Sequence, residues 1–146
     1  MGERERLAIM NSLVSHLQGA RVLDMFAGSG SLGIEALSRG ASHATFVDNN
    51  RKAVSTIKSN LKLLDARDYD FAASGKYNII FADPPYEAEL AALPLADLPG
   101  LLTLSGILVL STDKNTQVSP ALFDEELIQV SDKTYARARI TMWSRP

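Results

Sequence analysis

The chain has 146 residues, of which 46% are hydrophobic and 22% charged, and this composition is typical of a globular domain with a sizeable core. Its formal net charge of −2 gives no overall basic field that would indicate a nucleic-acid partner, although a local basic patch is compatible with one. The absence of cysteine excludes disulfides, cysteine-ligated zinc and thiol nucleophiles, and the isolated His16 and His43 do not suggest a metal site.

The N-terminus has no apolar signal region, and no apolar run is long enough to span a bilayer. The sequence also has no internal repeats, no low-complexity stretch and no segment that resembles a linker. We therefore expect a cytoplasmic protein with no membrane or metal partner, folded as a single domain over residues 1–146.

The apolar pattern predicts helices that alternate with strands. Residues 3–17 have apolar side chains at helical spacing and are followed by Gly19, so a helix is expected there. The pattern then predicts, in chain order, a strand over 21–26, a helix over 31–39, a strand over 44–48, a helix over 50–64, a strand over 77–82, a helix over 87–93 and a strand over 107–111.

Three segments give weaker patterns. Residues 65–76 are polar and give no assignment, residues 122–130 fit either a short helix or a strand, and residues 135–143 alternate as an edge or antiparallel strand would. Strands that alternate with helices favour an α/β fold. The sequence therefore predicts a mostly parallel sheet with helices on both faces.

A glycine-rich loop joins the first predicted strand to the following helix. Gly28, Gly30 and Gly33 form the pattern G-x-G-x-x-G, in which small residues let the backbone approach a ligand beside a helix N-terminus. Asp48 ends the second strand 20 residues after Gly28, where a carboxylate can accept hydrogen bonds from ribose hydroxyls. A tight turn that binds nothing is the alternative, but the carboxylate favours a site for a nucleotide-like ligand.

Asp24 lies inside the first predicted strand, just before the glycine-rich loop. A carboxylate there would repel the pyrophosphate of a dinucleotide such as NAD but would attract a cationic ligand. S-adenosylmethionine has no phosphate and carries an ammonium and a sulfonium group. We therefore expect Asp24 to serve the methionine end of this cofactor and Asp48 its ribose, the alternative being that Asp24 only caps the turn.

Asp83-Pro84-Pro85-Tyr86 leaves the carboxyl end of a buried strand, which is where open α/β sheets bind ligands. Because prolines fix the backbone, the carbonyl of Pro84 keeps its direction. That carbonyl and the Asp83 carboxylate can accept the two hydrogens of an exocyclic amine and orient its lone pair towards a methyl donor. Tyr86 offers a face on which a base can stack. The alternative is a rigid turn with a packed tyrosine.

Two stretches, VLDMFAGSGSLGIEALSRGA and NIIFADPPYE, resemble the Rossmann-like, S-adenosylmethionine-dependent methyltransferases. More narrowly, they resemble the RsmD-type family, which methylates guanine N2 in small-subunit ribosomal RNA. The resemblance covers residues 3–86. It implies a seven-stranded sheet whose last strand is antiparallel, and a monomeric enzyme whose partner is ribosomal RNA or the small ribosomal subunit. The cofactor site that it implies consists of Asp24, Phe26, Ala27, Gly28, Ser29, Gly30 and Asp48, with Asn49 near the adenosine.

The chain departs from the family pattern in two places. Family members usually carry a basic N-terminal extension that helps to grip RNA, and this chain begins within the helix that normally follows it. They also usually have a further strand that ends in an acid in contact with the adenine. The short segment before Tyr77 offers only Asp68 and Asp70 for that role, and the sequence does not choose between them.

Other functions stay open from the residues alone. The same chemistry could act on DNA adenine N6 or on a protein glutamine, although glutamine enzymes usually show Asn in place of Asp83 and DNA enzymes usually carry a target-recognition domain. An NAD-dependent oxidoreductase fits the glycine-rich loop but gives Asp24 no role. An inactive RNA-binding module that kept a cofactor pocket would show no methyl transfer for an Asp83→Ala change to abolish.

Overall fold

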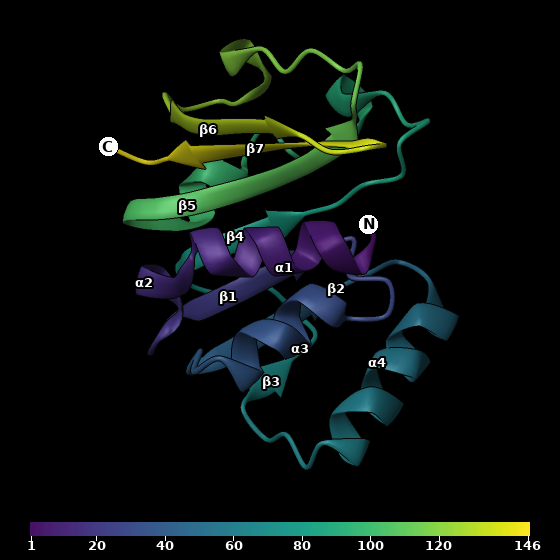
Figure 1. The fold of residues 1–146 in the computed structure, drawn as a ribbon. Helices are drawn as coiled ribbons and strands as arrows, with labels where there is room; N and C mark the ends of the chain where they lie inside the picture. The colour runs from purple at the N-terminus through teal and green to yellow at the C-terminus, as the bar shows by residue number, and fades with distance from the viewer.

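The computed structural model describes residues 1–146, and its strands form one seven-stranded sheet with the order β3-β2-β1-β4-β5-β7-β6 (Figure 1). Strands β1 to β5 pair in parallel, while β7 is antiparallel to both of its neighbours. The predicted α/β fold, with a mostly parallel sheet and an antiparallel last strand, is thus confirmed. The strands are β1 (Arg21–Met25), β2 (His43–Val47), β3 (Tyr69–Asp70), β4 (Tyr77–Ala82), β5 (Leu102–Asp113), β6 (Ile128–Thr134) and β7 (Ala138–Ser144).

The sheet is covered by four α-helices and three 3₁₀-helices. The helix expected over 3–17 is divided in two, because Leu13 leaves the helical conformation and its N–H donates to both Ile9 O and Met10 O. The helices expected over 31–39 and 50–64 are present. The helical elements are α1 (Glu3–Ser12), α2 (Val14–Leu17), α3 (Ser31–Ser38), α4 (Arg51–Leu63), η1 (Leu90–Ala92), η2 (Leu98–Leu101) and η3 (Pro120–Leu122).

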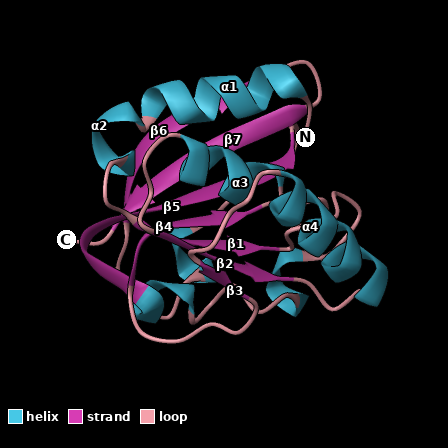
Figure 2. Cartoon of the chain, turned by 90° about the horizontal axis from the view of Figure 1, so that it is seen from below, coloured by secondary structure: helices cyan, strands magenta, loops and turns pink.

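Two apolar clusters lie on opposite faces of the sheet, because successive strand residues point to opposite sides. Val22 and Ile79 belong to the first cluster, which the four α-helices cover. Leu23 and Ile80 belong to the second cluster, which packs against side chains of the 3₁₀-helices and their loops. Helices therefore cover both faces, as expected, but the α-helices are all on one of them (Figure 2).

Three local predictions need correction. The segment 87–93 is not an α-helix but a turn followed by η1, and Pro94 disfavours helical backbone at Leu93. The ambiguous segment 122–130 contains the start of β6, so only its last three residues, 128–130, are in a strand. Strand β5 begins at Leu102, five residues before the apolar run that predicted it. Its first residues pair with the start of β4, and the register between the two strands shifts between Tyr77 and Ile79 of β4.

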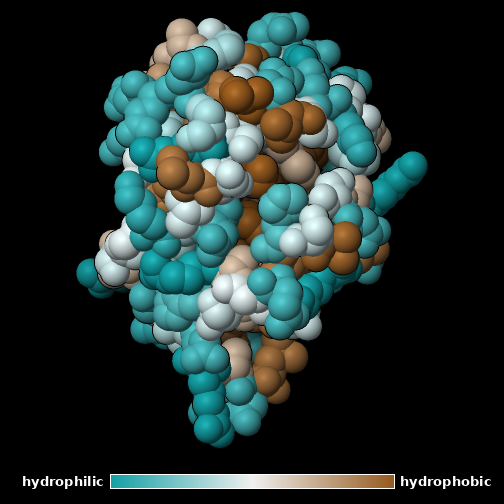
Figure 3. All heavy atoms as spheres, turned by 90° about the vertical axis from the view of Figure 1, so that its left-hand side faces the viewer, coloured by the Kyte–Doolittle hydropathy of each residue, from teal (hydrophilic) through white to brown (hydrophobic).

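The surface is mixed in character. None of the helices has the length and apolar character needed to cross a membrane. At the end of the molecule where α2 and the C-terminus lie, hydrophobic side chains form patches of limited size that hydrophilic side chains separate (Figure 3). Leu63, Leu64, Val14 and Leu104 are among the most exposed large apolar residues of the whole chain.

Candidate functional site: a cavity at the carboxyl ends of three strands

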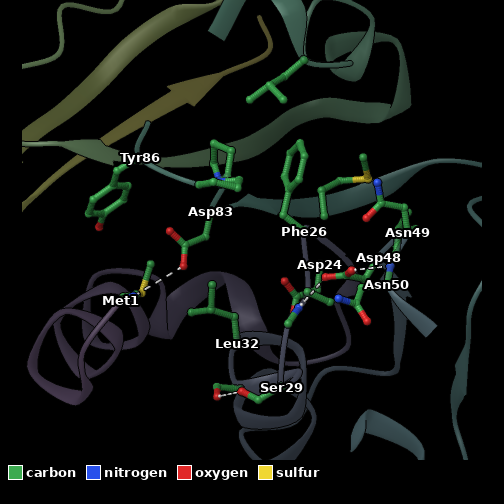
Figure 4. A pocket seen from close by; sticks show the side chains of 18 of the residues that line it. Met1, Asp24, Phe26, Ser29, Leu32, Asp48, Asn49, Asn50, Asp83 and Tyr86 are labelled. Atoms are coloured by element: carbon green, nitrogen blue, oxygen red, sulfur yellow. Dashed lines mark hydrogen bonds and ion pairs between the residues drawn. The ribbon is translucent and has the colours of Figure 1, made fainter. Parts of the chain in front are cut away.

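A cavity of about 820 Å³ lies at the carboxyl ends of β1, β2 and β4. Its size is that of a small-molecule or cofactor site. Figure 4 shows Asp83 and Tyr86 on one side of it, Asp48, Asn49 and Asn50 on the other, and Asp24 and Phe26 between them. The lining includes every site residue that the sequence predicted except Gly30: Asp24, Phe26, Ala27, Gly28, Ser29, Asp48, Asn49, Asp83, Pro84, Pro85 and Tyr86.

The loop after β1 folds back over the sheet through a run of left-handed backbone. Phe26, Gly28 and Gly30 have φ values of 59°, 57° and 81°. Only glycine adopts such angles freely, so Phe26 is held there by its surroundings, and strained residues of this kind gather at binding sites. The Ala27 N–H donates to Val47 O, and the Gly30 N–H donates to Ala27 O.

Gly30 does not line the cavity but lies on the side of the loop that packs against α4. It is the N-cap residue of α3, and a Cβ atom at this position would lie only 3.1 Å from the side chain of Ile57. The side chain of Asn60 donates to Ser29 O at 3.1 Å and so ties the loop to α4. Gly30 therefore acts on the cavity only through the turn that presents Gly28 and Ser29.

Asp48 connects the glycine-rich loop to the start of α4. One carboxylate oxygen accepts the Gly28 N–H at 2.9 Å, and the other accepts the Asn50 N–H at 2.9 Å. Because each carboxylate oxygen can accept two hydrogen bonds, Asp48 keeps acceptor capacity that faces the cavity. The side chain of Asn50 caps α4 by accepting from the N–H groups of Lys52 and Ala53.

Asp24 is almost fully buried, with 1% of its surface exposed, and accepts the N–H of Gly33 at 3.0 Å. Burial raises the pKa of its carboxyl from 3.8 to about 8; the Gly33 hydrogen bond opposes this rise, and the charges of Asp83 and Asp48 add to it. A cation that entered the cavity would favour the ionised form of Asp24. An anion would have the opposite effect, so these acids favour a cation over an anion in the cavity.

Asp83 and Tyr86 form the other side of the cavity. Burial raises the pKa of Asp83, while the Met1 amino group and the Ser111 hydroxyl lower it. The Met1 nitrogen lies 3.8 Å from Asp83 Oδ2. The Tyr86 hydroxyl lies 3.1 Å from Ser111 Oγ, so β5 holds the tyrosine that the loop after β4 presents.

Neither acid that the sequence offered for the adenine lines the cavity. Strand β3 ends at Asp70, which pairs with Thr45 in the middle of β2, so it stops short of the carboxyl edge where the cavity lies. Asp70 Oδ2 lies instead 3.3 Å from His43 Nε2, at the beginning of β2. Asp68 lies in a separate hollow between the ends of α3 and α4. The cavity lining therefore gives no support to an adenine contact through Asp68 or Asp70.

The sequence missed several residues of the site. Arg6, to which the sequence analysis gave no role, lines the cavity from α1. Ser111 was read only as the end of a buried strand. Asn50 could have been found, because an Asn before a helical run indicates an N-cap close to Asp48. The remaining lining residues that the sequence did not single out are Met1, Met25, Ser31, Leu32, Val47, Glu87, Leu93 and Pro94.

The strand order, the glycine-rich loop after β1 and the acids at the ends of β1 and β2 define the class of protein: a Rossmann-like methyltransferase. A family described as "Conserved hypothetical protein 95" matches residues 1–144. The chain belongs to this family, the RsmD-type methyltransferases.

Individual relatives agree with this assignment. The chain is 35% identical to YlbH of Bacillus subtilis, whose name describes a candidate rRNA methyltransferase, with 98% of this chain and 85% of that protein aligned. It is 29% identical to ribosomal RNA small subunit methyltransferase D of Haemophilus influenzae, over 91% and 76% of the two chains. A solved structure of a conserved hypothetical protein from Streptococcus pyogenes superimposes with a TM-score of 0.82 and 31% identity, over 97% and 95% of the two chains.

Proposed function

We propose that this protein transfers a methyl group from S-adenosylmethionine to an exocyclic amino group of a ribosomal RNA base, with guanine N2 of small-subunit RNA as the acceptor. The observation that supports this most directly is that the glycine-rich loop and Asp83-Pro84-Pro85-Tyr86 line the same cavity. The names of the relatives, which refer to ribosomal RNA and to the small ribosomal subunit, support the substrate class.

The lining of the cavity fits S-adenosylmethionine better than a dinucleotide. Asp24, Asp48 and Asp83 all reach it, and those that are ionised would repel a pyrophosphate, whereas a cation would also favour the ionised form of Asp24. Asp48 has acceptor capacity for ribose hydroxyls, and Asp24 lies where it can attract the cationic methionine end. When bound, the cofactor supplies an electrophilic methyl group on its sulfonium.

The acceptor side must orient a weak nucleophile. The lone pair of an exocyclic amine is delocalised into the base, so the amine reacts well only when it is held in the right geometry. The Asp83 carboxylate and the Pro84 carbonyl are suited to accept its two hydrogens and to hold the lone pair towards the methyl carbon. As the new N–C bond forms, the nitrogen loses one proton, for which Asp83 is the nearest acceptor in this arrangement.

The target base would rest against Tyr86. Its ring lines the cavity, and its hydroxyl is held by Ser111, so the ring has a fixed position. A base that stacks on such a ring gains about 1–3 kcal/mol. A base within a helix would first have to leave its stack, at a cost of a few kcal/mol that this contact helps to offset.

The test uses methyl-labelled S-adenosylmethionine with ribosomal RNA, small ribosomal subunits, DNA and a protein extract in parallel. We expect label in ribosomal RNA or in subunits, recovered as N2-methylguanine after digestion. The Asp83→Ala variant should lose transfer while its cofactor affinity, measured by calorimetry, stays the same. Label in DNA or protein would disprove the substrate assignment, and the absence of label from every acceptor would disprove the activity.

A further inference from the structure

Helix α4 has a cationic outer face. Four of the 15 cationic side chains of the protein lie on this helix, and none of its 17 acidic ones does. The apolar residues Ile57 and Leu61 point into the core, so the opposite face meets solvent. The exposed residues are Arg51, Lys52, Ser55, Thr56, Lys58, Ser59, Lys62 and Leu63.

Three of the cations lie in one row along the helix. Arg51, Lys58 and Lys62 are spaced so that they fall on the same face, with Ser55 between the first two. None of them is in an ion pair, so their charges have no acidic partner within the chain. Within the row, the Lys58 Nζ atom lies 5.3 Å from the centre of the Phe71 ring.

The position of Arg51 and Lys52 does not suit the helix itself. The first turn of α4 holds these two cations and no acid. The N-terminal end of a helix carries partial positive charge, so anions are favoured there and cations are disfavoured. Lys62 in the last turn does suit the helix dipole, but the first-turn pair needs a reason outside the helix. An external anion beside this turn would provide one.

The face adjoins the candidate active site. Asn49 and Asn50 line the cavity, and α4 begins at the next residue. The helix runs from the rim of the cavity along the outside of the molecule, where it lies at one edge in Figure 1. Its 13 residues correspond to about 20 Å, so a nucleic-acid strand that leaves the cavity could contact the whole row.

We propose that Arg51, Lys52, Lys58 and Lys62 of α4 bind the phosphate backbone of the RNA substrate on the side of the cavity opposite Asp83. This proposal rests on the proposed function and adds to it the surface that holds the substrate. Cations bind phosphates without regard to sequence, and exposed hydroxyls such as those of Ser55 and Ser59 commonly add hydrogen bonds to the backbone. The surface thus positions the RNA while Asp83 and Tyr86 select the base.

An anionic membrane is a poorer occupant of this face. A helix that lies on a membrane inserts an apolar face into it, and the apolar face of α4 is already buried against the sheet. RNA requires only the charge and the hydroxyls that the outer face presents.

The experiment compares two variants in which one arginine and two lysines are replaced by glutamine. The first, Arg51→Gln/Lys58→Gln/Lys62→Gln, removes the row on α4. The matched control, Lys114→Gln/Lys133→Gln/Arg137→Gln, removes three exposed, unpaired cations near the opposite edge of the sheet, beside β5, β6 and β7. Filter binding with labelled small-subunit ribosomal RNA, from about 50 to about 200 mM salt, gives the affinity and its salt dependence.

The α4 variant should bind RNA about tenfold or more weakly, with a salt slope reduced by about 2, since each lost contact to a single strand accounts for about 0.7. Its cofactor affinity should not change. A single Arg51→Glu variant should also bind RNA more weakly, while its melting temperature should be equal to or higher than that of the wild type, because an acid suits the first turn. Weaker binding with unchanged folding therefore supports the proposal.

Two results would overturn the proposal. If the α4 variant and the wild type had equal RNA affinities and salt slopes, α4 would not touch the RNA. If the control variant lost as much RNA affinity as the α4 variant, the effect would not be specific to α4. In both cases methyl transfer by the wild-type protein would leave the proposed function intact. If the wild type neither bound RNA nor methylated it, the proposed function and the α4 surface would both be wrong.

Discussion

The hydroxyl of Tyr86 lies 3.1 Å from the buried hydroxyl of Ser111, which joins the loop after β4 to the end of β5. Ser111 does not line the cavity itself, and it lies close enough to Asp83 to lower the pKa of that carboxyl. One small side chain thus supports both groups that are proposed to hold the acceptor base. We regard Ser111 as a positioning residue.

The Ser111→Ala change should lower kcat for methyl transfer by about tenfold, since a misplaced acceptor loses part of the benefit of orientation. The KM for S-adenosylmethionine should stay the same. Steady-state kinetics with both substrates separate the two constants. Tyr86→Phe provides the matched test: if Ser111 acts through Tyr86, the double variant should be no slower than the slower single variant, and independent, multiplicative losses would contradict this role.

The raised pKa of Asp83 should be visible in the pH dependence of transfer. If the ionised carboxylate holds the amine, activity falls as the pH drops through this pKa, and because burial raises the value, the fall begins above the pH at which an ordinary aspartate is protonated. The measurement is kcat against pH. In Asp83→Asn the residual activity should lack this acidic limb; an identical limb in that variant would assign it to another group.

Asp24 should make the stability of the ligand-free protein depend on pH. In the folded protein the Asp24 carboxyl keeps its proton up to about pH 8, whereas in the unfolded chain it loses the proton near pH 3.8. The unfolded state therefore binds fewer protons between these two pH values. Stability from this group therefore falls as the pH rises through that window and then levels off. Asp24→Asn removes the decline, so the melting temperature of the variant should rise relative to that of the wild type as the pH increases. A difference in melting temperature that did not change with pH would contradict the prediction.

The same carboxyl should couple cofactor binding to pH. A bound cation favours ionised Asp24, so binding of S-adenosylmethionine should release a proton below about pH 8 and tighten as the pH rises towards that value. Calorimetry in two buffers of different ionisation enthalpy measures the proton release. Asp24→Asn should bind the cofactor more weakly and without this release, and pH-independent binding by the wild type would argue against a contact between Asp24 and the cationic end.

The sequence predicted the centre of the sheet well, because β1, β2 and β4 are buried on both faces and appear as short apolar runs. It predicted the ends of the fold less well. Strand β3 has only two residues, so it leaves no periodic pattern, and exposed residues near the start of β5 hide its true length. These elements depend on pairing with a neighbouring strand, which a local pattern does not contain.

The site shows the same division. Gly28, Asp48 and Asp83 follow strand ends that adjoin each other in a parallel sheet, so their spacing along the chain was sufficient to bring them to one cavity. Ser111 and Arg6 come from β5 and α1, and nothing near them in the sequence indicates that Ser111 lies against Tyr86 or that Arg6 lines the cavity. The sequence could not choose between Asp68 and Asp70 for a related reason, since the reach of β3 is set by its pairing with β2.

Gly33 offers the sharpest test of how the glycine-rich loop is packed. A Cβ atom at Gly33 would lie 2.4 Å from the ring of Phe46, a residue that is 1% exposed. The ring cannot move away easily, so Gly33→Ala should cost about 1–3 kcal/mol, as overpacked cores do. It should also weaken cofactor binding, because the Gly33 N–H holds Asp24. Denaturant unfolding and calorimetry measure the two effects.

Gly28 provides the control, because the reason for glycine there is different. Its φ is +57°, and a Cβ atom would meet nothing within 4 Å, so Gly28→Ala should cost about 1–2 kcal/mol through backbone strain alone. Phe46→Leu makes room beside Gly33 and should offset part of the cost of Gly33→Ala, but it should leave the cost of Gly28→Ala unchanged. If Phe46→Leu relieved both substitutions equally or neither of them, steric contact with Phe46 would not be the reason for glycine at position 33.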